Sequence, residues 1–233
     1  MRGFAILSER LNSRFGIPLD MNARTKLNAP LTIRFHLTDG TARAFTQADA
    51  AISEKLWDEI DPSRLFARPR IVVGSEHSKS VFVVSEIIRV DFHHDSFHCW
   101  KFQGGYSDIV EVSEEEFRNG AGLNEPSLGT KRDRPMQPGD LLVAFIRLQM
   151  RGGQPLLAKV EAVAKLRAES QSFMQFLLSK AAVHMRLRGG GIGVVNLANL
   201  AGYTVYPGVP QLPADSWLAE PISEGVHSIS RFA

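Results

Sequence analysis

The chain has 233 residues, of which 44% are hydrophobic and 22% charged, with a formal net charge of +2. This composition is ordinary for a globular protein and excludes disordered, collagen-like and coiled-coil chains. A chain of this length can bury a hydrophobic core, either as one large domain or as two small ones.

The cysteine content and the apolar runs narrow the cellular setting. Cys99 is the only cysteine, so no disulfide can form within the chain, which favours a reducing, cytoplasmic compartment. Residues 4–7 are too short an apolar run for a signal peptide. Residues 189–214 carry no charge, but their apolar part, 192–206, is shorter than the roughly 20 residues that cross a bilayer. We therefore expect no membrane segment and interpret 189–214 as buried core or a subunit contact.

The first predicted elements are a hairpin and a helix. Residues 31–35 and 41–45 alternate between apolar and polar, and the Asp39-Gly40 pair between them is a typical hairpin turn. Residues 47–60 carry apolar side chains at helical spacing and end at Asp61-Pro62.

Short β-rich runs follow, and they predict a group of strands. These runs are 70–74, 81–84, 87–92, 100–102 and 109–112. Ser113 with Glu116 then forms a capping box, which predicts one turn of helix closed by Asn119-Gly120.

The second half of the chain predicts a long hairpin and a long helix. Residues 141–150 and 155–163 are β-rich and flank the turn Arg151-Gly152-Gly153. Residues 166–187 form the longest helical pattern, and it is apolar enough to be largely buried. The sequence shows no internal repeat.

Together these elements predict an α+β fold with antiparallel, hairpin-based sheets, two main helices and two small units. The first unit spans residues 1–118, with a β-β-α-β-β core and an acidic middle. Residues 119–137, rich in Gly, Asn and Pro, form the predicted linker. The second unit spans 138–233, with the hairpin, the apolar helix and a tail containing glycine and proline.

The charges are sorted along the chain. Residues 45–128 hold 8 basic and 15 acidic side chains, whereas residues 129–190 hold 11 basic and 4 acidic ones. Such asymmetry suggests a surface for nucleic acid or for an acidic protein, although a solvated basic face would look the same. The candidate contact residues are Lys131, Arg132, Arg134, Lys180, Arg186 and Arg188.

A second candidate site lies in residues 91–99. His94 and His98 are four residues apart, and Asp91 and Cys99 are further donors that could hold zinc. The two-histidine zinc motif of metalloproteases requires a helix, however, and this run follows a strand. A polar loop at the end of that strand is the simpler interpretation.

The sequence therefore favours a non-catalytic binding or accessory protein that contacts nucleic acid or an acidic partner through its basic C-terminal half. One alternative is a metal-dependent hydrolase built on 91–99, with zinc as its cofactor. Without that activity we expect no cofactor. The other is a structural homo-oligomer in which 189–214 forms the subunit contact.

Overall fold

The computed structural model describes residues 30–58, 62–94, 109–123, 141–163, 180–206 and 217. The elements of the first half are β1 (Leu31–Leu37), β2 (Ala42–Gln47), α2 (Ala50–Asp58), α3 (Pro62–Leu65), β3 (Arg70–Gly74), β4 (Lys79–Val83), the 3₁₀ turn η2 (Val84–Glu86) and β5 (Ile87–His93). They are followed by β6 (Ile109–Glu111), α4 (Glu114–Gly120), β7 (Leu141–Met150), β8 (Leu156–Val163), β9 (Ala182–Arg186), β10 (Ile192–Asn196), the 3₁₀ turn η5 (Leu197–Asn199) and β11 (Leu200–Tyr206).

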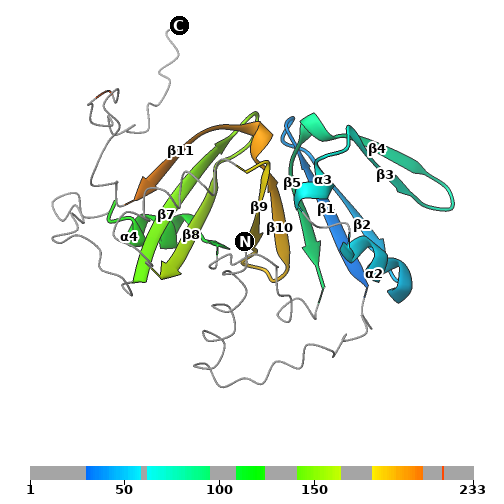
Figure 1. Cartoon of the computed structure of the whole chain (residues 1–233), viewed down its shortest axis with the longest axis horizontal. Helices are drawn as coiled ribbons and strands as arrows, with labels where there is room; N and C mark the ends of the chain where they lie inside the picture. Colours follow the sequence, from blue (N-terminus) through cyan, green and yellow to red (C-terminus); the bar gives the residue numbers. More distant parts are fainter. Residues whose placement is uncertain are drawn as a thin grey trace, which may run out of the picture.

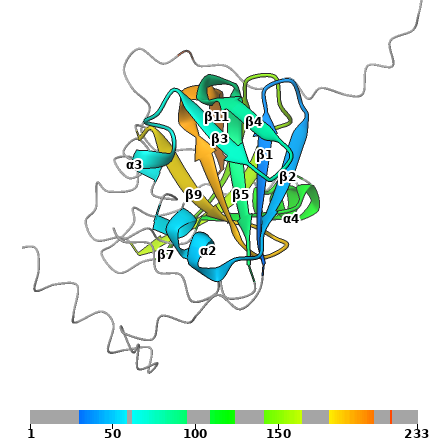
Figure 2. The ribbon, with the colours of Figure 1, turned by 90° about the vertical axis from the view of Figure 1, so that its right-hand side faces the viewer.

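Nine of the strands form one sheet in the order β11-β7-β8-β6-β9-β10-β5-β1-β2. Its pairings are antiparallel except for a single parallel contact between β6 and β9. The strands β3 and β4 form a separate hairpin, which lies across β1, β2 and β5 when that end of the molecule is viewed directly (Figure 2). In Figure 1, β11 stands at one end of the described structure and the β3–β4 hairpin at the other.

The predicted α+β class is wrong, because the described structure is mostly β. The main error is in the predicted 166–187 helix. Residues 182–186 form the strand β9, in which four consecutive residues are buried, while 166–179 lie outside the described residues. A strand covered on both faces shows no alternation, so its sequence cannot be told from that of a buried helix.

Other predicted elements are confirmed. The hairpins 31–45 and 141–163, the strands at 70–74, 81–84, 87–92 and 109–112, and the core of the 47–60 helix all occur. The Asp39 carboxylate stabilises the first turn by accepting hydrogen bonds from the backbone N and Oγ1 of Thr41, at 2.8 and 2.7 Å. These bonds lower the pKa of Asp39. The predicted strand 100–102 and the linker beyond residue 123 lie outside the described residues.

Three hydrophobic clusters are buried in the described structure, the smallest of them between α4 and the sheet around Phe117 and Phe145. The other two are larger. The first is built mainly from β1, β4 and β5, and its centre is Phe35 stacked on Phe82 with ring centroids 4.3 Å apart. The second is built mainly from β7, β8 and β9, around Ile146, Leu148 and Met185. The pairing of β10 with β5 joins the two larger clusters in one continuous sheet. The predicted fold of hairpin-based sheets with two main helices is therefore replaced by one nine-stranded sheet and a two-stranded hairpin.

The same order of elements occurs twice, which the sequence analysis missed. Each half has a long hairpin (β1–β2, β7–β8), a shorter hairpin (β3–β4, β9–β10), a 3₁₀ turn (η2, η5) and a last strand (β5, β11). In each half the last strand pairs antiparallel with the first, β5 with β1 and β11 with β7.

The hydrogen-bond register of the two halves also agrees. In the first half Leu37 pairs with Ile87, and the register then slips by one residue. In the second half Met150 pairs with Leu200, followed by the same slip. Each such pair of equivalent residues is separated by the same 113 residues (200 − 87 = 113). A matching bulge at a matching position indicates a duplicated unit.

The two 3₁₀ turns contact each other through buried amides. The Asn196 Nδ2 donates to the carbonyls of Val84 and Ile87, at 3.1 and 3.0 Å. The Asn199 Nδ2 donates to Ser85 and Ile87, both at 2.9 Å. The Val84 carbonyl also accepts from the Ile87 backbone N, so these amides add hydrogen bonds to the carbonyls of η2 and of the first residue of β5.

We expect Asn196→Ala to lower the free energy of unfolding by about 1–3 kcal/mol, because it removes two hydrogen bonds in a site where Asn196 is 1% exposed. Urea unfolding followed by fluorescence measures this. The exposed Ser85→Ala on the same corner is the control and should change stability by less than about 0.5 kcal/mol. Equal losses in both variants would contradict the assigned role of Asn196.

Candidate functional site

A charged cluster is buried on β5, where Arg89 and Asp91 are 8% and 3% exposed. The Arg89 Nε lies 2.7 Å from Asp91 Oδ1, and the Arg89 Nη2 donates to Asp91 Oδ2 at 3.0 Å. His36 Nε2 lies 2.7 Å from the same Oδ2. The Arg89 Nη1 donates to Glu111 of β6 at 2.7 Å. The cluster therefore ties together β1, β5 and β6.

A glycine makes room for this cluster on the neighbouring strand. Gly193 of β10 pairs directly with Asp91. A Cβ at Gly193 would lie 3.1 Å from Asp91 Oδ1 and 3.2 Å from Arg89 Cδ. These contacts are tight, so a larger residue would push against the ion pair.

One of the predicted metal residues, Asp91, belongs to this charged cluster. The Asp91 carboxylate contacts His36 and the guanidinium of Arg89, and the Arg89 charge balances its own. His94 is buried, while His98 and Cys99 lie outside the described residues. Within the described ranges, no three His, Cys, Asp or Glu side chains are grouped to hold a metal ion. Zinc binding at 91–99 stays a prediction.

The predicted basic residues are only partly placed. Lys180 precedes β9, whereas Arg186 ends that strand and Arg188 follows it, so they lie at opposite ends. At about 3.3 Å per residue, Lys180 and Arg186 are roughly 20 Å apart. Arg186 and Arg188 are exposed beside the glycine turn 189–191. Lys131, Arg132 and Arg134 lie outside the described residues.

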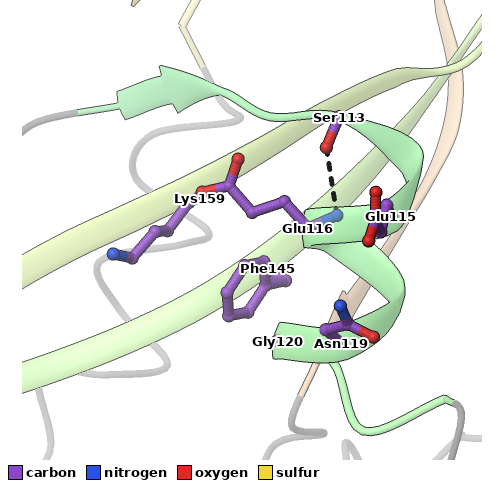
Figure 3. Close-up of a pocket in the computed structure, with 7 residues that line it drawn as sticks. All are labelled: Ser113, Glu115, Glu116, Asn119, Gly120, Phe145 and Lys159. Atoms are coloured by element: carbon purple, nitrogen blue, oxygen red, sulfur yellow. Dashed lines mark hydrogen bonds between the residues drawn. The ribbon is translucent and has the colours of Figure 1, made fainter.

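An open hollow of about 540 Å³ lies beside α4. Figure 3 shows Glu115, Glu116 and Lys159 around it, with the Phe145 ring against Gly120. The Ser113 Oγ accepts from the Glu116 backbone N at 3.0 Å, which confirms the predicted cap. The Lys159 Nζ lies 2.5 Å from Glu161. The geometry of α4 and the pairing of Lys159 explain these charges without a ligand.

A smaller apolar hollow of about 260 Å³ lies between β1, β2 and β3, beside α2 and α3. Its lining includes Phe35, Phe45 and Leu56. Small-molecule pockets usually measure about 300–1,000 Å³. This hollow is smaller, so we interpret it as a packing feature of the first cluster.

The most unusual surface is the outer face of the β3–β4 hairpin. We define the valine face as Val72, Val81 and Val83, which are 55%, 49% and 47% exposed. Val72 and Val81 are direct cross-strand partners, so the three side chains share one face. The sequence does not reveal this exposure, because valines in a β-rich run are normally buried.

Four strands have an edge without a partner in the described structure: β11 and β2 at the two ends of the nine-stranded sheet, and both strands of the β3–β4 hairpin. Of these four strands, β4 carries two exposed large apolar side chains, and β3 and β11 carry one each. β4 pairs only with β3, and β11 pairs only with β7. Tyr203 of β11 is 46% exposed. Edges of this kind present unpaired N–H and C=O groups and accept further strands. The valine face and the edges of β4 and β11 are the candidate functional site.

Comparison with protein-family models, curated proteins and solved structures finds no match to this chain. No helix within the described ranges is long and apolar enough to span a membrane.

We expect Arg89→Met to lower the free energy of unfolding by about 3–5 kcal/mol, because it leaves the Asp91 charge buried without its partner. The double variant Arg89→Met/Asp91→Leu should recover much of that loss. Chemical denaturation of both measures this.

The control is Glu114→Ala, which removes an exposed ion pair to Arg147 at 3.5 Å and should cost less than about 1 kcal/mol. A double variant no more stable than Arg89→Met alone would show that packing, and not the unpaired charge, determines the loss.

Proposed function

We propose that this protein is a non-catalytic structural protein that associates with further copies of itself through the open strand edges. The valine face carries the proposal. Val72 and Val81 are cross-strand partners and are 55% and 49% exposed, and contiguous exposed apolar patches often mark interaction sites.

The position of the surfaces supports an assembling role. The β3–β4 hairpin and β11 lie at opposite ends of the described structure (Figure 1). β11 falls within residues 189–214, the uncharged segment in which the sequence analysis placed a subunit contact. A molecule with a binding edge at each end can join two neighbours at once.

We expect the sedimentation coefficient of the purified full chain to rise with protein concentration. Association through backbone pairing and apolar contact should persist when salt is raised, because screening weakens only the interactions between charges. Sedimentation velocity at low and high salt measures both effects. A monomer at every concentration would overturn the proposed function.

A second candidate function is the binding of nucleic acid or an acidic partner, and one observation favours it. Arg186 and Arg188 are both exposed at the turn between β9 and β10, beside the glycines 189–191, whose lack of side chains lets a phosphate approach the backbone closely. Such binding needs only cations at the right spacing and would weaken steeply as salt rises.

Fluorescence anisotropy with short RNA and DNA tests this second function. We expect Arg186→Ala/Arg188→Ala to weaken binding by tenfold or more at low salt, since each lost phosphate contact reduces affinity. Lys180→Ala, at the other end of β9, is the matched control and should change affinity much less. Absence of saturable binding at low salt would remove this candidate.

A further inference from the structure

The pairing of β10 with β5 within the chain shows how one copy could pair with another. β10 of the second half pairs antiparallel with β5 of the first, with Val194 opposite Val90. Both valines are 0% exposed and belong to the first hydrophobic cluster. This contact extends the sheet of one half with the short hairpin of the other.

The duplication identifies the counterparts of these two strands. β4 occupies in the first half the position of β10 in the second, because each precedes the 3₁₀ turn. β11 occupies in the second half the position of β5 in the first, with the same bulge against its partner. β5 and β10 pair with each other, whereas β4 and β11 have open edges in the described structure.

We infer that β4 of one copy pairs antiparallel with β11 of another, repeating between chains the contact that β10 makes with β5 within the chain. The inference rests on the proposed function and names the two surfaces that meet. Transferred by the 113-residue equivalence, the register places Val81 opposite Tyr203, Lys79 opposite Val205 and Phe82 opposite Gly202.

The side chains at these positions suit such a contact. Val194 covers the first cluster, and its counterpart Val81 is 49% exposed. Val90 is the cross-strand partner of Val194, and its counterpart Tyr203 is 46% exposed. Val205, next along β11, packs against the second cluster. Of the six large hydrophobic side chains exposed in the described residues, Val72, Val81, Val83 and Tyr203 lie on these two surfaces.

The valine face corresponds to a face that is buried within the chain. On the β9–β10 hairpin, Val194 and Asn196, the counterparts of Val81 and Val83, are 0% and 1% exposed, and their face also holds His184 (8%), the cross-strand partner of Val194. The pairing of β9 with β10 is shifted by one residue relative to that of β3 with β4, so the counterpart of Val72, Met185, lies on the other face. The face with Val194 lies toward the first half, since Val194 and Ala182 are part of the first cluster. The valine face would lie in the same way over Tyr203 and Val205 of the next copy.

The contact between chains should be weaker than its internal template. The counterparts of Asn196 and Asn199 are Val83 and Glu86, so the four amide hydrogen bonds to the turn η2 have no equivalent. The contact would also join two different surfaces, which produces a ring if the rotation closes and a filament if it does not.

Two charge substitutions on the full-length chain test the inference. Val81→Glu disables the β4 surface and Tyr203→Glu disables the β11 surface, and both side chains are exposed in the single chain, so folding should be retained. Each variant alone should sediment as a monomer. An equimolar mixture should form dimers and nothing larger, because each variant keeps the surface that the other lacks. Ile52→Glu on α2, also exposed (44%), is the control and should assemble like the unmodified chain.

The outcomes separate the inference from the proposed function. If the unmodified chain assembles and both variants still assemble, the chain self-associates through another surface, and the β4–β11 contact is overturned. If the unmodified chain is a monomer, the proposed function fails and the inference with it. Monomeric variants whose mixture also stays monomeric would overturn the head-to-tail geometry.

Cysteine cross-linking checks the register independently of assembly size. In a Cys99→Ser background, Val81→Cys and Tyr203→Cys on separate chains should form a disulfide-linked dimer when mixed and oxidised, since directly opposed strand residues bring their Cβ atoms within about 5.5 Å. Ile52→Cys mixed with Tyr203→Cys is the control and should give little product. Equal yields in the two mixtures would overturn the register.

Discussion

The structure depends on the antiparallel pairing of β5 with β10, because it joins two hydrophobic clusters into one sheet. Both strands are fully or almost fully buried, so their polar groups need partners inside the protein. Arg89 and Asp91 find those partners in each other, in His36 and in Glu111. Gly193 opposite Asp91 leaves room for them. At the end of the same strands, Asn196 supplies the hydrogen bonds that hold the two 3₁₀ turns together.

The duplicated arrangement explains why this pairing leaves a surface open. One short hairpin, β9–β10, covers the last strand of the other half, whereas β3–β4 has no such strand available within the described structure. The outer faces of the two hairpins therefore occupy equivalent places in the two halves, but one is buried and the other is exposed. Val194 is buried and Val81 is half-exposed, although they occupy equivalent places. In the described structure the sheet does not close on itself, so β11 and β2 remain as its end strands and β4 keeps an open edge.

The repeat was not visible in the sequence, for a physical reason. Backbone hydrogen bonds and buried volume define a strand pairing, and many residue combinations satisfy both. Along the equivalent strands, Ile33 and Arg34 match Ile146 and Arg147, but most other positions differ. Phe82 corresponds to Val195, and Val83 to Asn196. The two halves are equivalent in strand order, in register and in the position of the bulge. None of these features requires particular residues, so a comparison of residue identities does not detect them.

The sequence by itself determined the local elements: the hairpin around Asp39, the core of the 47–60 helix, the long hairpin at 141–163 and the cap at Ser113. These follow from turn chemistry, capping and side-chain periodicity over a few neighbouring residues. Only the tertiary structure decided that 182–186 is a strand, that Asp91 is paired with Arg89, and that Val81 and Tyr203 are exposed. Each depends on which strand lies alongside, and that choice is made between segments far apart in the chain, where local periodicity carries no information.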